Sequence, residues 1–99
     1  KFANETIKFY TKKNLMENVN FLEKKNSVVL KEFFFNHSSE VIFRSFTEVI
    51  RMVGRKYYPV RGKKIDRIIS KINKESSLKV TLGGCIIKKV NQTIIVSKE

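Results

Sequence analysis

The residues with the clearest chemical potential in this sequence are the cations between Arg51 and Lys74. This window holds nine Lys/Arg residues and one acid, Asp66, and it carries +8 of the chain's net charge of +12. Positive charge concentrated in one stretch repels itself, and a polyanion relieves that repulsion while releasing its condensed counterions. Because Ile65, Ile68 and Ile72 recur at helical spacing in the same window, we expect a folded basic surface rather than a basic tail. The pattern predicts a nucleic-acid interface.

The candidate phosphate ligands are the Lys and Arg residues of this window. Cations one helical turn apart can follow the phosphates of a strand, and the fork of an Arg side chain can bind one phosphate through two hydrogen bonds. The candidates are Arg51, Arg55, Lys56, Arg61, Lys63, Lys64, Arg67 and Lys71. Tyr57 and Tyr58 lie in the same basic stretch; either one stacks on an exposed RNA base or packs between two helices, and the sequence leaves both readings open.

Other reactive residue types are sparse. The only histidine, His37, has no second histidine, cysteine pair or acid cluster to complete a metal site, so we expect a loop or cap role for it. The single cysteine, Cys85, cannot form an internal disulfide, and we expect it to be buried in a protein of a reducing, cytoplasmic compartment. The pair Gly83-Gly84 favours a sharp bend over phosphate binding. We therefore predict no catalytic, cofactor-binding or metal-binding residue, and no membrane span, in this chain.

The apolar pattern predicts three helices. The first covers 4–18, and Asn4 can cap it. The second covers 39–53, where an apolar stripe faces a charged side and Gly54 follows as an expected C-cap. The third covers 63–74 and directs its cations outward, so it is the element expected to present the basic surface.

The run VVLKEFFF at 28–35 favours a short helix over a buried strand, because two charged residues interrupt strict alternation. Beyond residue 76 the apolar period changes to about two. Extended segments are expected at 78–82, 85–90 and 93–98, and the last two flank Asn91-Gln92 as a hairpin.

These elements predict a small, mainly helical α+β domain with a C-terminal β-hairpin or three-stranded sheet. Residues 1–35 form a helical lead-in segment in this scheme. Residues 36–99 form the substrate-binding part, which combines a helix pair with the hairpin.

The order of elements from Val41 onward resembles the C-terminal region of tRNA(Ile)-lysidine synthetases. In that family a proline and a basic residue open the second helix, as Pro59 and Arg61 do here. The family's hairpin begins with a Leu-Gly pair, here Leu82-Gly83, and continues with apolar and then basic residues, here 86–89. Its last strand ends in a basic-acidic pair, matched by Lys98-Glu99. The matching segments are VGRKYYP, PVRGKKIDRII, TLGGCIIKK and IIVSKE.

The resemblance implies a two-part cytoplasmic ligase. Its N-terminal ATP-pyrophosphatase domain uses ATP and Mg to adenylate the anticodon cytidine of tRNA(Ile) and then joins lysine to it. The Ser-Gly-Gly phosphate loop of that domain does not occur in these 99 residues. The chain is then the non-catalytic part that binds tRNA(Ile) and works with the ATP-pyrophosphatase domain of the same protein.

Two alternatives remain open. The helices at 39–53 and 61–74 could form a DNA-binding helix-turn-helix regulator, although the connection from Gly54 to Gly62 is longer than the usual three or four residues and contains Pro59. The chain could also be a structural appendage that packs on a catalytic domain, with its lysines reflecting compositional drift.

Overall fold

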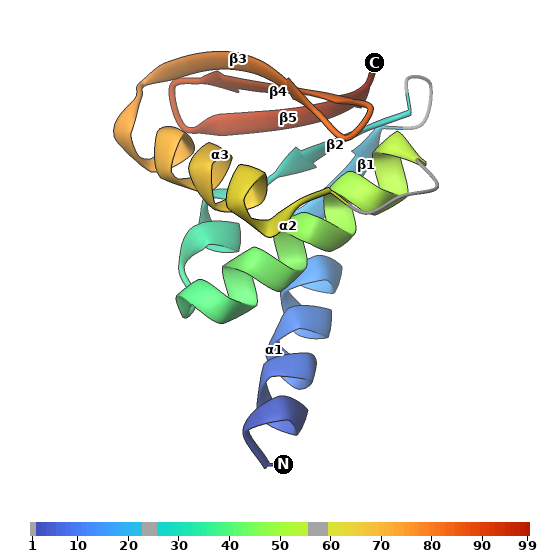
Figure 1. Cartoon of the computed structure of the whole chain (residues 1–99), viewed down its shortest axis with the longest axis vertical. Coiled ribbons are helices and arrows are strands. Elements are labelled where there is room, and N and C mark those ends of the chain that lie inside the picture. The colour runs from blue at the N-terminus through green and yellow to red at the C-terminus, as the bar shows by residue number, and fades with distance from the viewer. Residues whose placement is uncertain (1, 23–25, 56–59) are drawn as a thin grey trace.

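The computed structural model describes residues 2–22, 26–55 and 60–99. In these ranges the chain belongs to the α+β class, as the sequence predicts, with three α-helices and five strands (Figure 1). The helices are α1 (Phe2–Asn18), the one-turn 3-10 helix η1 (Glu32–Phe35), α2 (Ser39–Gly54) and α3 (Gly62–Lys74). The strands are β1 (Val19–Leu22), β2 (Ser27–Leu30), β3 (Ser77–Leu82), β4 (Cys85–Val90) and β5 (Thr93–Lys98).

The five strands form one antiparallel sheet in the order β1-β2-β5-β4-β3. Two-residue turns at Gly83-Gly84 and Asn91-Gln92 join the last three strands, and Gly83, Gly84 and Asn91 have φ values of 57°, 83° and 57°. Positive φ suits the tight turns whose twist matches that of the flanking strands. The C-terminal three-stranded sheet is therefore confirmed, and β2 extends it by pairing with β5, where Val28 lies opposite Val96.

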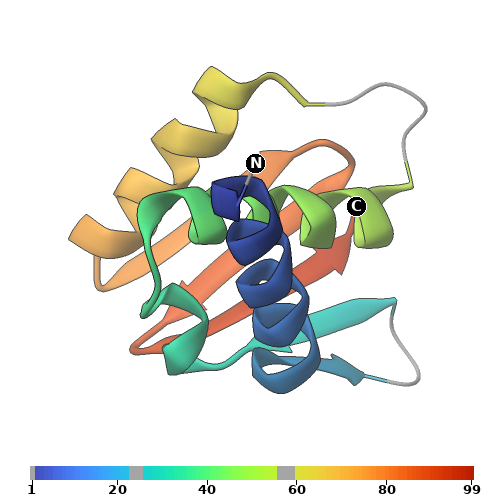
Figure 2. The same cartoon turned by 90° about the horizontal axis from the view of Figure 1, so that it is seen from below.

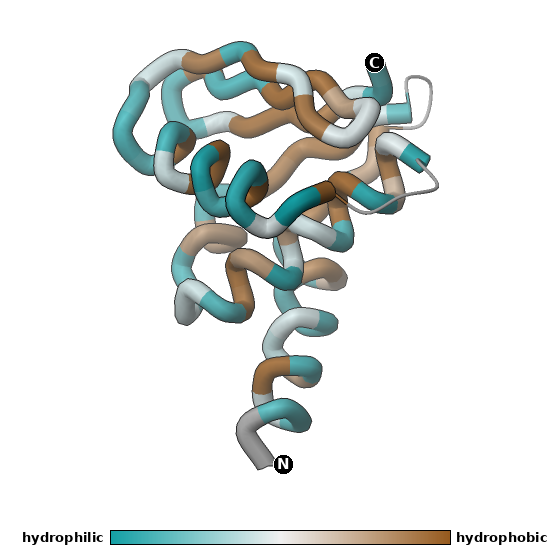
Figure 3. Tube along the Cα trace, in the orientation of Figure 1, coloured by the Kyte–Doolittle hydropathy of each residue, from teal (hydrophilic) through white to brown (hydrophobic). Residues whose placement is uncertain are grey.

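All three helices lie on one face of this sheet, and no described element covers the other face (Figures 1 and 2). Alternate residues of the central strands point into the resulting core, where they meet the apolar stripes of α2 and α3. Figure 3 shows these stripes as hydrophobic colour toward the sheet and hydrophilic colour along the outside of α3. The core includes Val28, Leu30, Phe46, Val49, Ile50, Ile65, Ile68, Ile72, Ile87, Ile94 and Val96.

Two buried asparagines tie α1 to the rest of the fold. The Asn14 side-chain amide donates to the Phe34 carbonyl at 3.1 Å, and the Asn18 amide donates to Asn14 Oδ1 at 2.8 Å. Buried amides need such partners, because an unpaired one loses its hydrogen bonds to water without replacement. The helix begins at Phe2, so Asn4 lies inside its first turn and is not its cap.

The expectation of a helix over 28–35 is wrong for 28–30, and only a single 3-10 turn forms in the rest of that range. Val28, Val29 and Leu30 complete strand β2, whose neighbours are β1 and β5. After Lys31 the chain makes the single 3-10 turn of η1, which buries Phe34. The charged residues thus mark the end of a buried strand. The segment 1–35 contributes two strands to the sheet in addition to its helix.

Gly54 has a different role from the expected C-cap. Helix α2 includes Gly54, and the left-handed residue after it is Arg55, with φ of 54° and an N–H that donates to the Arg51 carbonyl at 3.1 Å. A Cβ atom at Gly54 would lie 2.1 Å from the Gly83 carbonyl oxygen. The position therefore needs glycine because the end of α2 packs directly on the β3–β4 turn.

Candidate nucleic-acid interface

Helix α3 carries its cations on a single side. It buries Ile65, Ile68 and Ile72 against the sheet. At 3.6 residues per turn, its five Lys and Arg side chains fall within an arc of about 100° on one flank. These are Lys63, Lys64, Arg67, Lys71 and Lys74, all exposed, while the opposite flank holds Asp66, Ser70 and Asn73.

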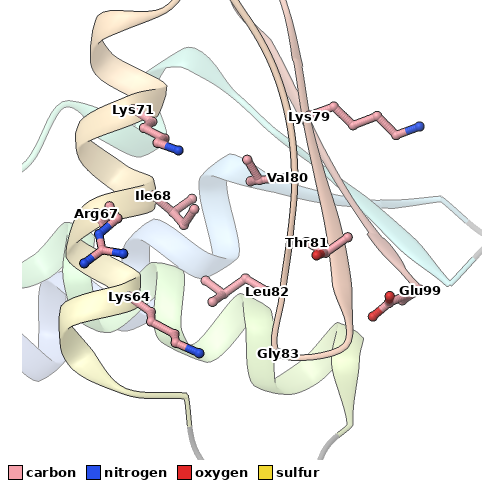
Figure 4. Close-up of a pocket in the computed structure, with 10 residues that line it drawn as sticks. All are labelled: Lys64, Arg67, Ile68, Lys71, Lys79, Val80, Thr81, Leu82, Gly83 and Glu99. Carbon is pink, nitrogen blue, oxygen red and sulfur yellow. The ribbon is translucent and has the colours of Figure 1, made fainter.

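Three of these cations line an open groove between α3 and the edge strand β3. Lys64 and Lys71 extend from α3 toward β3, with Arg67 between them (Figure 4). The floor is apolar and consists of Ile68 with side chains from β3. The remaining lining residues are Lys79, Val80, Thr81, Leu82, Gly83 and Glu99. The groove thus combines a cationic wall with an apolar base.

The first turn of α3 carries positive side chains, which the positive end of the helix dipole disfavours. Arg61 is the N-cap residue and makes no side-chain capping bond, and the first turn contains Lys63 and Lys64 but no acid. Positive charge at a helix N-terminus is unfavourable, by about 0.3–1 kcal/mol per charge at exposed sites. A bound phosphate would reverse this effect, because it would meet both the dipole and the side-chain charges with the opposite sign.

Within the described ranges, the acids of the chain neutralise few of the predicted ligands. The two ion pairs found there join Arg44 to Glu40 and Arg51 to Glu48, both on α2. Arg51 binds Glu48 through two nitrogens at 2.6–2.9 Å, and this hydrogen bonding holds the pKa of Glu48 below its ordinary value. Among the predicted ligands that the structure describes, Arg51 is therefore the one that is already paired.

Of the other predicted residues, one lies on α3, two lie at helix caps and three fall outside the described residues. Lys63 follows the same flank of α3 as the groove cations, one turn before Arg67. Arg55 is the C-cap residue of α2 and Arg61 the N-cap residue of α3; both are exposed, and neither lines the groove. Lys56, Tyr57 and Tyr58 lie outside the described residues, so base stacking by the tyrosines stays a prediction.

Lys79 is the groove cation that is absent from the residues predicted above. It lies on β3 directly opposite Lys88 of β4, and its side chain extends from the far side of that strand (Figure 4). The signal was available, because a two-residue turn at Gly83-Gly84 fixes Leu82 opposite Cys85 and therefore Lys79 opposite Lys88.

The remaining chemically distinctive residues have structural positions. Cys85 is buried and its thiol donates to the Ile50 carbonyl at 3.4 Å; burial raises the pKa of this thiol to about 11. His37 lies in the bend before α2, next to Ser38, whose hydroxyl accepts from the Val41 N–H. Among the described residues, no group of His, Cys, Asp and Glu could hold a metal ion.

Comparisons with protein-family models, with curated proteins and with solved structures give no match for this chain. In the part of the chain that the structure describes, no helix has the length and apolar character needed to cross a membrane.

Proposed function

We propose that this chain binds tRNA through the groove between α3 and β3, as the C-terminal region of a tRNA(Ile)-lysidine synthetase. The observation that carries the proposal is the row formed by Lys64, Arg67 and Lys71, which are exposed and make no ion pair within the described residues. Successive members of this row lie three or four residues apart on one flank of a helix, a spacing of about 4.5–6 Å along its axis. Such a row suits the phosphates of one RNA strand.

The proposed mechanism is electrostatic docking without chemistry in this chain. Contacts to the RNA backbone supply affinity, and the shape of the folded tRNA supplies discrimination. Docking would orient tRNA(Ile) so that its anticodon cytidine reaches the ATP-pyrophosphatase domain, where ATP, Mg and lysine would react. The sequence resemblance supports this assignment, and the unpaired cations support the binding role independently of it.

The test is filter binding of tRNA and of duplex DNA of similar length, at equal salt. We expect tRNA to bind more tightly, and the logarithm of its affinity to fall with the logarithm of salt at a slope of about −3 to −5, as expected for three to six phosphate contacts. Equal or tighter binding of the duplex would favour the helix-turn-helix regulator. Absence of binding at low salt would reject the proposal.

Exposed apolar side chains on the outer side of α1 favour a second role, in which the chain packs on a catalytic domain as an appendage. Phe9 and Met16, two turns apart on that helix, are 61% and 73% exposed. Exposed apolar side chains aligned on one helix face are typical of a contact surface. The two roles use different elements and are compatible, since α1 extends away from α3 and β3 (Figure 1).

A further inference from the structure

The uncovered face of the sheet carries two lysines in direct opposition. Lys79 of β3 pairs in register with Lys88 of β4, and both side chains are exposed. Their neighbours Val80 and Ile87 point toward the helices, so the two lysines share the opposite face. Like charges directly across an antiparallel pair destabilise the sheet. This pair is therefore an unfavourable arrangement for the free protein.

No acid offsets this charge on the described strands. The outward positions of the sheet carry hydroxyl, amide, apolar and lysine side chains only: Asn20, Leu22, Ser27, Val29, Ser77, Lys79, Thr81, Ile86, Lys88, Val90, Thr93, Ile95 and Ser97. Glu99 follows β5 and borders the groove with Lys79, but the two form no ion pair. An external anion would supply the charge that the sheet lacks.

The lysine pair is continuous with the α3–β3 groove. Lys79 and Thr81 line the groove from the outer side of β3, while Val80 and Leu82 line it from the inner side. Strand β3 forms the edge of the described sheet, with β4 on one side only. Alternate backbone N–H groups along such an edge have no strand partner and can donate to phosphate oxygens. A chain of phosphates that follows α3 can therefore pass along β3 and reach the outer face.

We propose that Lys79 and Lys88 form a second phosphate subsite, and that RNA bound along α3 continues around the edge of β3 onto the open face of the sheet. This inference rests on the proposed function. It extends the contact from one helix flank to both sides of β3, with Lys79 as the link between them.

The experiment compares tRNA binding by wild-type protein, K79Q/K88Q and the control K12Q/K13Q across a salt series. The control removes the same charge from exposed positions of α1. For K79Q/K88Q we expect the plot of log affinity against log salt to be shallower than that of the wild type by about 1.5–1.8. The ratio of wild-type to variant affinity should therefore fall about tenfold between about 50 mM and 200 mM salt. Because cross-strand repulsion is removed, the melting temperature of free K79Q/K88Q should also rise, by about 1–4 °C.

Hydroxyl-radical footprinting of the tRNA ribose backbone locates the subsite. We expect K79Q/K88Q to lose protection at nucleotides adjacent to those deprotected by K64Q/R67Q/K71Q. A slope and footprint equal to those of the control would overturn the subsite and leave the groove proposal standing, provided that the groove variant still weakens binding. Salt-independent or absent binding of tRNA by the wild-type protein would overturn the groove proposal, and this inference with it.

Discussion

Removing the three groove cations is the most direct perturbation of the proposed interface. The variant K64Q/R67Q/K71Q lowers the net charge from +12 to +9 and leaves the buried face of α3 unchanged. Glutamine has nearly the helix propensity of lysine and arginine, so α3 should persist. The matched control is K8Q/K12Q/K13Q, which removes three charges from exposed positions of α1.

The expected changes in tRNA affinity and in its salt dependence follow from counterion release. Each lost phosphate contact reduces the salt slope by about 0.9, so three contacts reduce it by about 2.7. Raising the salt from about 50 mM to about 200 mM weakens tRNA binding about 3.5-fold for each phosphate contact. The ratio of the wild-type affinity to that of the groove variant should therefore fall about 40-fold over this range. Filter binding of tRNA over this salt range measures both quantities, with circular dichroism to confirm that both variants fold. If the groove variant and the α1 control have the same slope, the groove is not the tRNA interface, because net charge alone would then explain binding.

Three further predictions concern the fold that positions the groove. Gly54→Ala should lower the free energy of unfolding by about 1–2 kcal/mol, since the clash with the β3–β4 turn outweighs the gain in helix propensity. Gly62→Ala should be neutral or stabilising, because a Cβ atom there would make only ordinary contacts. Urea denaturation measures the free energy of unfolding of both variants. Alkylation of Cys85 at about pH 8 should be at least about 100-fold slower in the folded protein than in urea, because the raised pKa keeps the thiol protonated until the pH approaches 11. Asn14→Ala should cost about 1–3 kcal/mol in urea denaturation, because the Phe34 carbonyl loses its buried donor; no loss would show that water replaces the amide.

The parts of the fold that the sequence predicted are those with local signals. Helices α2 and α3 have apolar residues at a clean helical period, and the last three strands alternate around two-residue turns. Strand β2 was missed because much of its stability comes from a distant strand. Of its two neighbours, β1 is short and largely exposed, and β5 lies more than sixty residues away. A three-residue apolar run looks the same in a helix or a strand.

Gly54 shows a second limit of sequence reasoning. A glycine after a helical stripe fits a C-cap, because glycine adopts the left-handed conformation without strain. The structure instead places the left-handed conformation at Arg55 and uses the missing side chain of Gly54 for contact with Gly83. Close approach between distant backbone segments leaves no periodic signature in a sequence.

For the candidate site, the sequence supplied the cations but not the surface opposite them. Helical periodicity indicated that Lys63, Arg67 and Lys71 share a flank of α3. That β3 lies beside this flank depends on how the helix packs on the sheet, which tertiary contacts determine. Arg51 was included on charge alone, but it lies on α2, does not line the groove and is paired with Glu48 on the preceding turn.

The distribution of charge on α3 argues against compositional drift as the whole explanation of its lysines. Drift toward lysine would act on every exposed position of the helix, whichever way it faced. On α3 the exposed positions of one flank are all cationic, while the exposed side chains of the other flank are those of Asp66, Ser70 and Asn73. The cationic flank also includes positions in the first turn, where positive charge opposes the helix dipole. These charges are unfavourable for the free protein, yet they lie together on one side of α3 and along an open groove. An anionic ligand explains this arrangement better than a compositional bias, which would act on both flanks alike.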